Sequence, residues 1–192
     1  MIEIYDNVVP VEVQDKINKE LTDPWFPWYL SSGDNHSTVS TFRSEYGELK
    51  TWSHLNIKEY IQFVHFFWKD GPTSTGAEHI VDMFKNFCKK VNIDYGNISR
   101  IKANLQTQCN FSKEDFCNTP HMDHYSPHIV GIYYVNNSDG NTNIFDTNGK
   151  IIKSVEPIKG RFLIFDGNYY HAGRHPISTD KRIVINFNFY KE

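Results

Sequence analysis

The sequence is poor in cysteine, has no long apolar run and carries no strong excess of charge. Its three cysteines, Cys88, Cys109 and Cys117, are an odd number without C-x-x-C spacing, which argues against a disulfide framework and a zinc knuckle. No apolar stretch approaches the roughly 18 residues that span a bilayer, and the start lacks the basic and apolar regions of a signal peptide. We therefore expect a cytoplasmic protein with reduced thiols and no membrane partner.

The charge of the chain gives no general attraction to nucleic acid. The formal charge is −3 and the isoelectric point is near 6.3, so a nucleic-acid substrate would need a local basic patch. The 192 residues are 39% hydrophobic and 15% aromatic, which is sufficient for one domain with a sizeable core. Because we find no repeat, low-complexity tract or linker, we expect a single domain over residues 1–192.

The N-terminal half of the chain is expected to form a helical buttress. After a short strand at residues 2–5, the apolar side chains of residues 13–21 recur every four positions, as in an amphipathic helix. Residues 77–91 follow a 3.6-residue period closely, and residues 55–68 read as helical or mixed. The pattern therefore predicts two or three helices within residues 1–97, together with segments on the substrate side of the molecule.

The C-terminal half changes to short β-rich runs separated by turn residues. These runs lie at residues 98–108, 128–135, 143–146, 150–155, 161–165 and 182–190. Asn148-Gly149 falls between two of them and is a strong hairpin signal. Many short strands at close spacing indicate a double-sheet jelly roll. The predicted fold is therefore mainly β with N-terminal helices (α+β): a double-stranded β-helix, or jelly-roll and cupin-like core, over residues 98–192, buttressed by two or three helices.

His121, Asp123 and His171 are the residues that could bind a metal ion. A strand places alternate side chains on one face, so His121 and Asp123 can converge on one point. His171 follows an apolar strand and a turn, which would bring it to the edge of the same sheet system. Two imidazoles and a carboxylate are the ligand set that leaves three faces of an iron(II) ion open. We therefore predict that these three residues are metal ligands and form the catalytic centre.

Three further histidines lie close to these residues in the sequence. His124 has the opposite strand parity to His121, and His128 is expected to begin the next strand. His175 is expected to be an exposed loop residue. None of the three is therefore predicted to be a metal ligand.

Arg182 opens the last β-rich run, whose residues 183–189 are largely apolar. A buried cation there needs an anionic partner, because leaving it unpaired would cost several kcal/mol. A bound dicarboxylate would supply that partner. A structural ion pair with an Asp or Glu residue is the alternative.

These residues resemble the iron(II)- and 2-oxoglutarate-dependent dioxygenases, and within them the prolyl 4-hydroxylase-like branch. The likeness covers roughly residues 100–190. Besides the His-x-Asp and distal His, Arg182 matches the basic residue on the strand after the distal histidine. Three strands resemble the family's "YYLN", "GGxTxF" and "PxxGxxxxF" patterns at residues 131–136, 139–145 and 157–165.

The resemblance implies an enzyme that binds iron(II) through the triad and uses 2-oxoglutarate and dioxygen as cosubstrates. Three protein ligands leave two positions for 2-oxoglutarate and one for dioxygen. Arg182 and Tyr134 are expected to hold the far carboxylate of 2-oxoglutarate, with Thr142 as a further contact. Asp123 is present where halogenating relatives carry a small residue. We therefore expect 2-oxoglutarate decarboxylation coupled to hydroxylation of an unidentified substrate, a peptide, protein or small molecule, with a prolyl residue the nearest specific guess.

The sequence also departs from the family patterns. Asp139 replaces the first glycine of "GGxTxF", and the strand before His-x-Asp lacks the family's tyrosine. Asn104 and Gln106 alternate onto one face of that strand and could donate to the cosubstrate. The polar face of a solvated strand would look the same.

The substrate entrance is the least constrained part of the prediction. Tyr125, Trp52 and Arg43 could line it, because segments before the β core and after His-x-Asp often face the open side of the iron in this family.

Two alternatives to this function stay open at the level of sequence. The first is a cupin-like metal enzyme that needs no 2-oxoglutarate and has no use for a buried Arg182. The second is a non-catalytic jelly-roll binding module that keeps the metal residues as structure. Turnover of 2-oxoglutarate to succinate without added substrate would exclude the second.

Overall fold

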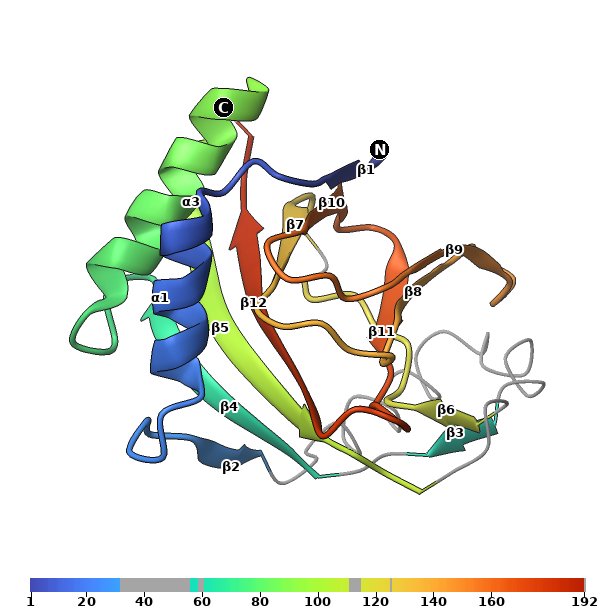
Figure 1. Cartoon of the computed structure of the whole chain (residues 1–192). Coiled ribbons are helices and arrows are strands. Elements are labelled where there is room, and N and C mark those ends of the chain that lie inside the picture. The colour runs from blue at the N-terminus through green and yellow to red at the C-terminus, as the bar shows by residue number, and fades with distance from the viewer. Residues whose placement is uncertain (32–55, 59–60, 111–114, 125, 192) are drawn as a thin grey trace.

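The computed structural model describes residues 1–31, 56–58, 61–110, 115–124 and 126–191. Its largest element is a seven-stranded antiparallel sheet (Figure 1). In spatial order the strands are β1 (Ile2–Tyr5), β10 (Phe162–Asp166), β7 (Ile129–Tyr134), β12 (Lys181–Phe189), β5 (Ile98–Thr107), β4 (Gln62–Lys69) and β2 (Tyr29–Ser31).

A three-stranded sheet faces the inner side of the large sheet. It consists of β11 (Tyr170–Gly173), β8 (Thr142–Phe145) and β9 (Ile151–Val155), and a separate parallel pair is formed by β3 (Asn56–Lys58) and β6 (Asp115–Cys117). Ile144 and Val155 from the small sheet share one buried cluster with Ile132 and Val184 from the large one. The two sheets therefore enclose a common interior, which confirms the predicted jelly-roll core.

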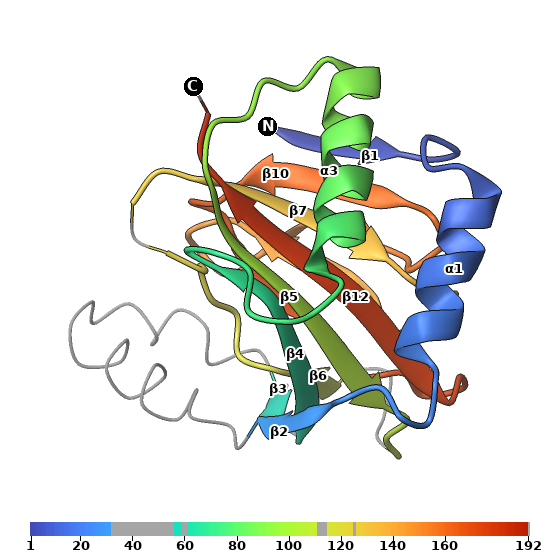
Figure 2. The ribbon, with the colours of Figure 1, turned by 90° about the vertical axis from the view of Figure 1, so that its left-hand side faces the viewer.

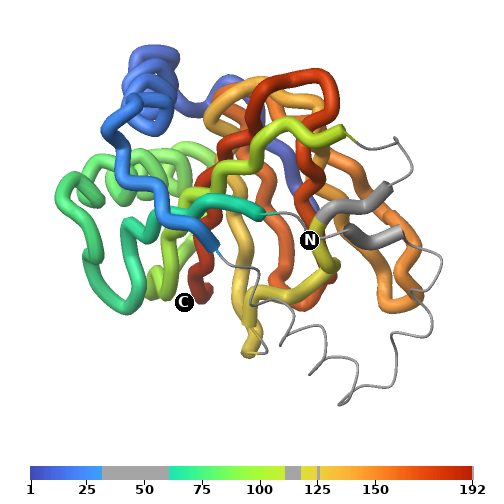
Figure 3. The backbone as a smooth tube through the Cα atoms, turned by 90° about the horizontal axis from the view of Figure 1, so that it is seen from below, coloured from blue at the N-terminus to red at the C-terminus, as the bar shows by residue number. Residues whose placement is uncertain are grey.

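Two helices, α1 (Val11–Leu21) and α3 (Ala77–Val91), cover the outer face of the large sheet (Figure 2). Phe84 of α3 stacks on Phe187 with ring centroids 4.6 Å apart, and Phe87 stacks on Phe162 at 3.8 Å. Seen from below, the helices and the small sheet lie on opposite sides of the large sheet (Figure 3). The expectation of helices that buttress a β core is therefore confirmed for the described residues.

The alternation of side chains along the strands of the large sheet separates the core beneath the helices from the interior between the two sheets. On β12, Ile183, Ile185, Phe187 and Phe189 join the cluster beneath the helices, whereas Val184 joins the cluster between the sheets. This is the period of two that every β-strand imposes on its side chains. One strand can therefore supply a hydrophobic core with one face and a polar site with the other.

The expectation of helical or mixed structure at residues 55–68 is wrong for the described part of this segment. Residues 62–69 form β4, which pairs with β5 and with β2. His65 and Phe67 are buried while Phe66 between them is exposed, which is strand alternation. The apolar spacing fitted a helix, but pairing with the edge of β5 and the high aromatic content favour a strand. The segment 1–97 therefore supplies four described strands as well as two described helices.

The hairpin signal at Asn148-Gly149 is confirmed. β8 pairs with β9 across this turn, and Gly149 adopts a φ of +78°. The amide of Gly149 donates to the carbonyl of Asp146 over 3.1 Å. Neither helix in the described residues is long and apolar enough to cross a membrane. The cytoplasmic location stays a prediction.

Candidate active site

A cavity of about 290 Å³ opens between the inner faces of the two sheets. Strands β5 and β12 and the loop over residues 118–123 contribute most of its wall. The described lining residues that this site uses are Arg100, Lys102, Asn104, Gln106, His121, Asp123, Thr142, His171, Arg182 and Asn186. The site residues among them are up to 86 positions apart in the sequence, from Arg100 to Asn186.

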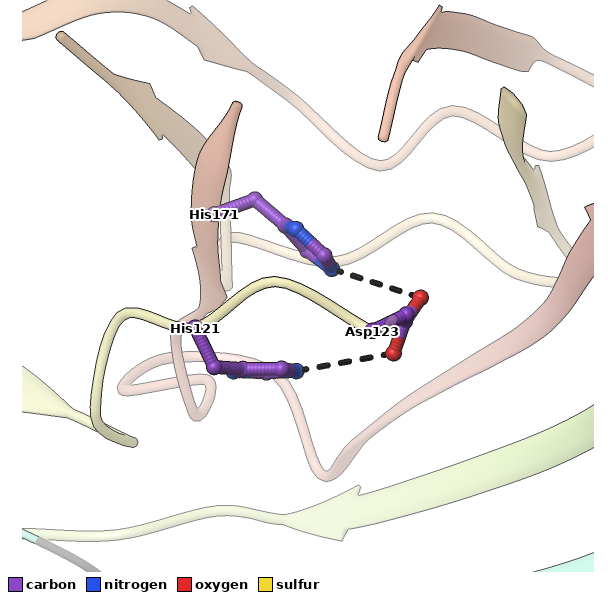
Figure 4. Close-up of side chains that lie close together, drawn as sticks. All are labelled: His121, Asp123 and His171. Atoms are coloured by element: carbon purple, nitrogen blue, oxygen red, sulfur yellow. Dashed lines mark ion pairs between the residues drawn. The ribbon is translucent and has the colours of Figure 1, made fainter. Parts of the chain in front are cut away.

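One end of the cavity holds the predicted metal triad (Figure 4). The backbone amides and carbonyls of His121 and His171 form two reciprocal hydrogen bonds, of 3.1 and 3.0 Å. The carboxylate oxygens of Asp123 lie 3.8 Å from Nε2 of His121 and 3.8 Å from Nε2 of His171. One ligand atom from each residue lies within 4.8 Å of the others. The structure therefore brings the three residues together.

The route to this convergence differs from the expected strand parity. His121 and Asp123 do not share a strand: His121 forms an isolated β-bridge to His171, and Asp123 lies in a bend two residues later. His121 is fixed further because its Nδ1 lies 2.9 Å from the carbonyl oxygen of Thr119. This contact turns Nε2 toward the other two side chains, which is how metal-binding histidines are commonly oriented.

The carboxylate of Asp123 is held by three residues that the sequence analysis missed. Arg100 donates to Oδ1 over 2.5 Å, and Asn186 and Asn188 donate to Oδ2 over 3.0 and 2.8 Å. Burial alone would raise the pKa of Asp123, but Arg100, the two histidines and the Asn188 hydrogen bond outweigh it and hold that pKa well below its usual range. Asp123 is therefore an anion with a fixed orientation.

The donor set fits a metal ion such as iron(II). Burial, together with the charge of His121, lowers the pKa of His171 to about 3, so its imidazole is neutral at pH 7 and can donate a lone pair. Two imidazoles with one oriented carboxylate, held by outer hydrogen bonds, match the requirements of a two-histidine, one-carboxylate centre.

The other end of the cavity is organised around Arg182, which is only 3% exposed. Its three nitrogens donate over 2.7 Å each to the carbonyl of Gly140, to Oε1 of Gln106 and to Oγ1 of Thr142. All three acceptors are neutral, and no carboxylate of the described residues pairs with Arg182. The alternative of a structural ion pair is therefore not observed in the described part of the chain.

Tyr134 lies behind this end of the cavity. Its hydroxyl donates to Oγ1 of Thr142 over 2.8 Å, and its ring lies 5.9 Å from the guanidinium carbon of Arg182. Tyr134 is fully buried and is not among the described residues that line the cavity. Its hydroxyl reaches the cavity through Thr142, so a direct contact with a cosubstrate stays a prediction.

Asn104 and Gln106 both line the cavity, as their parity on β5 predicts. The amide oxygen of Gln106 accepts from Arg182, so Gln106 orients the guanidinium. The expected donation from Asn104 and Gln106 to a cosubstrate stays a prediction.

Asp139 and Gly140 show why the glycine motif changes here. The carboxylate of Asp139 accepts hydrogen bonds from the amides of Ile177, Ser178 and Thr179. Burial alone would raise the pKa of Asp139, but these bonds outweigh it and lower that pKa to about 2. A Cβ on Gly140 would lie 2.3 Å from a backbone oxygen, so only the second glycine is sterically required.

The expectation that His175 is exposed is wrong. Its side chain is 0% exposed, and Nδ1 lies 3.0 Å from the carbonyl oxygen of Thr107 and 3.4 Å from Sγ of Cys109. These partners precede it by more than 60 residues, so no local pattern could place it. His124 and His128 pack against each other at 5.2 Å and lie outside the triad. Tyr125, Trp52 and Arg43 lie outside the described residues.

Comparisons with known proteins relate these features to a family. The model of the 2OG-Fe(II) oxygenase superfamily matches residues 106–190. Comparison with curated protein sequences found no match.

Solved structures of prolyl hydroxylases share the fold. A prolyl hydroxylase from Trichoplax adhaerens, in complex with a fragment of hypoxia-inducible factor, is 11% identical with a TM-score of 0.58, over 99% of this chain and 83% of that one. A Pseudomonas putida prolyl-4-hydroxylase is 10% identical with a TM-score of 0.53, over 100% and 92%. The viral collagen prolyl hydroxylase of Paramecium Bursaria Chlorella virus-1 is 12% identical with a TM-score of 0.51, over 100% and 96%.

The family match spans the second half of the chain and includes the whole triad, Tyr134, Thr142 and Arg182. The family relies on iron(II), 2-oxoglutarate and dioxygen, and the His-Asp-His triad supplies a fitting metal centre. Both alternatives left open by the sequence, a metal enzyme without 2-oxoglutarate and a non-catalytic module, disagree with this match. Residues 106–190 therefore match the 2OG-Fe(II) oxygenase superfamily, within a chain that has the fold of the prolyl hydroxylases.

Proposed function

We propose that this oxygenase hydroxylates a C–H bond of its substrate, with His121, Asp123 and His171 as the ligands of iron(II). The observation that carries the proposal is the buried Arg182 at the far end of the cavity. Its partners in the described residues are all neutral, so its positive charge is left for a ligand to neutralise. The far carboxylate of 2-oxoglutarate fits this requirement, because the metal triad lies in the same cavity.

The residues of the chain would divide the work between binding and orientation. Bound at the triad, iron(II) would supply the activation of dioxygen that accompanies decarboxylation of 2-oxoglutarate. Arg182 and Thr142 would hold the far carboxylate, while Gln106 and Tyr134 fix their positions. Asn104 also faces the cavity and would contact the bound cosubstrate.

A peptidyl residue, with proline the nearest guess, is the proposed site of hydroxylation. The support is the shared fold with prolyl hydroxylases, one of them in complex with a peptide. At 10–12% identity this support concerns the architecture around the cavity. A small-molecule substrate stays the alternative.

We also propose that residues 1–192 act as one domain. β1 and β4, from residues 1–97, pair with β10 and β5 of the jelly roll. The same segment supplies α1 and α3, which share a buried cluster with the strands of residues 98–192. The two parts therefore depend on a common sheet and a common core.

The experiment that tests the metal and cosubstrate roles uses optical spectroscopy without oxygen. Wild-type protein with iron(II) and 2-oxoglutarate should develop the weak metal-to-ligand charge-transfer band near the green. His121→Ala and Asp123→Ala should abolish the band, because each removes a ligand. His79→Ala is the matched control, since His79 lies on α3 and pairs with Glu20, and it should keep the band.

Arg182→Met should weaken 2-oxoglutarate binding by about 10- to 100-fold, because charge-assisted hydrogen bonds contribute about 1.5–3 kcal/mol each. Titration of the band with 2-oxoglutarate measures this affinity. Arg161→Met is the matched control, since Arg161 pairs with Asp6 at the surface, and it should bind 2-oxoglutarate as the wild type does. Unchanged affinity in Arg182→Met, or a wild-type protein that gives neither band nor succinate, would refute the proposal.

A further inference from the structure

Strand β5 presents a row of four polar side chains to the cavity. Arg100, Lys102, Asn104 and Gln106 all line it, whereas Ile101 and its odd-numbered neighbours face the helices. Two members of the row already have partners at opposite ends: Arg100 pairs with the metal-ligand carboxylate, and Gln106 with the arginine of the cosubstrate end. Lys102 lies between them and has no role in the proposed function.

Lys102 makes no hydrogen bond or ion pair with any residue that the structure describes. Burial lowers the pKa of Lys102 to about 8, with a further contribution from Arg100 and an opposing one from Asp123. The ammonium group is therefore the main form at pH 7, although it has lost much of its hydration. A partly buried cation in this state gains stability when an anion joins it.

The charges of the filled cavity leave Lys102 unneutralised. Asp123 is the one carboxylate among its described lining residues, and Arg100 already pairs with it. One carboxylate of 2-oxoglutarate would neutralise Arg182, and the other, together with Asp123, would neutralise a divalent metal ion. This leaves the charges of Arg100 and Lys102 without a counter-charge. A further negative charge would still be favourable beside Lys102, because two like cations in one low-dielectric cavity repel each other.

The position of Lys102 points to the substrate rather than to the cosubstrate. Lys102 lies opposite Asn186 in the β5–β12 register, and Asn186 donates to Asp123. It is two residues from Arg100, which contacts the metal end, and four from Gln106, which contacts the Arg182 end. An anion at Lys102 would therefore lie on the metal side of the cavity, where the reacting C–H bond must come.

We infer that the substrate carries a small oxyanion, a carboxylate or a phosphate, and that the Lys102 ammonium binds it beside the metal centre. This inference rests on the proposed function, since it assigns 2-oxoglutarate to Arg182. It narrows the substrate to acidic molecules, such as a peptide with a free or side-chain carboxylate next to the target residue.

The test compares the binding of anionic probes with that of their neutral amides, on protein saturated with metal ion and 2-oxoglutarate. Wild-type protein saturated with manganese(II) and 2-oxoglutarate is titrated calorimetrically with N-acetylproline and N-acetylprolinamide, with acetate and acetamide, and with inorganic phosphate. At least one of the carboxylates should bind about tenfold more tightly than its amide, or phosphate should bind measurably. The reason is that a charge-assisted contact contributes more than a neutral one. Which anion binds separates a carboxylate from a phosphate ligand.

Three variants assign the effect to Lys102. Lys102→Met and Lys102→Gln should lose the preference for the anion, and Lys102→Arg should keep most of it. Two neutral replacements are used so that a folding defect in one leaves the other to decide. Lys153→Met is the matched control, because Lys153 is exposed on β9 in the other sheet, and it should bind the probes as the wild type does.

The contrary results are distinct from a failure of the proposed function. A wild-type protein that binds no probe anion, or a preference that survives both Lys102→Met and Lys102→Gln, overturns the inference. Weaker 2-oxoglutarate binding in those variants would instead assign Lys102 to the cosubstrate and also overturn it. In each of these cases the wild-type protein would still show the charge-transfer band. A wild-type protein without that band would instead refute the proposed function.

Discussion

The two faces of β12 are equally buried, yet they differ in composition and in purpose. Toward the helices the strand presents Phe187 and Phe189, which pack on Phe84 of α3. Toward the cavity it presents Asn186 and Asn188, which donate to Asp123. Successive residues of one strand thus serve hydrophobic packing and metal-ligand orientation in turn.

This difference separates the residues that stabilise the fold from those that serve the metal site. The helix face gains its free energy from apolar area removed from water, which tolerates little loss of volume. The cavity face consists of polar groups that burial would penalise unless each has a partner or a ligand. Changes on the two faces should therefore have different consequences, and neighbouring positions allow a matched test.

The largest effect on stability is expected for Phe187→Ala on the helix face. Phe187 is 0% exposed and stacks on Phe84, so its truncation should lower the free energy of unfolding by about 3–5 kcal/mol. Urea unfolding followed by circular dichroism measures this change. The remaining folded protein should still bind manganese(II) with near wild-type affinity, and a loss of metal affinity comparable to that of a ligand variant would break the separation of the two faces.

Asn188→Ala on the cavity face should have the opposite profile. Asn188 donates to Oδ2 of Asp123 and accepts from Nε of Arg100, so its loss leaves the ligand carboxylate less firmly held. Metal affinity should fall by about 10- to 100-fold, as for other residues that orient metal ligands. Calorimetric titration with manganese(II) measures the affinity. If the affinity is unchanged and only stability falls, Asn188 is a packing residue like its neighbour.

The smallest effect is expected at Asp139, which lies outside both faces, binds the amides of residues 177–179 and should respond to pH. Its pKa is lowered to about 2 by hydrogen bonds from residues 177–179, against about 3.9 in an unfolded chain. The stabilisation is therefore complete above the unfolded pKa and is lost as the pH falls through about 2. Asp139→Asn should lower the free energy of unfolding by about 1–2 kcal/mol at pH 7.

Urea unfolding at pH 7 and at pH 3 distinguishes this mechanism from simple packing. The difference between wild type and Asp139→Asn should shrink toward pH 3 and below. At pH 3 the Asp139 carboxylate is largely protonated in the unfolded chain and still ionised in the folded one, so part of the stabilisation is already lost. An equal difference at both pH values would contradict the assigned role. Asp146→Asn, in the β8–β9 turn, removes another carboxylate that accepts backbone amides and serves for comparison.

Local signals in the sequence were sufficient for much of the fold. The 3.6-residue period of residues 77–91 and the Asn148-Gly149 turn depend on neighbours in the chain, and both structures formed as predicted. The helical or mixed prediction for residues 55–68 was wrong where they form β4, because the conformation of β4 depends on pairing with β5, more than 30 residues away. The β-propensity of a segment carries no information about which distant strand it will pair with.

The site was predictable only at positions whose residue types are rarely buried without a ligand or a partner. Arg182 in an apolar strand meets this condition, and the His-x-Asp pattern became informative through the ordered family resemblance around it. Arg100 and Asn188 were missed because their partner, Asp123, lies 23 and 65 positions away. Asn186 and Asn188 did give a signal, since two alternating amides in an otherwise apolar strand must find hydrogen-bond partners when buried.

The reciprocal backbone hydrogen bonds between His121 and His171 have an evolutionary consequence. They join main-chain amides and carbonyls, which every amino acid except proline can supply in full. The spacing of two ligand positions is thus inherited independently of what their side chains are. Descendants of this fold could exchange donor types, and with them metal preference or reaction outcome, by single substitutions that leave the scaffold in place.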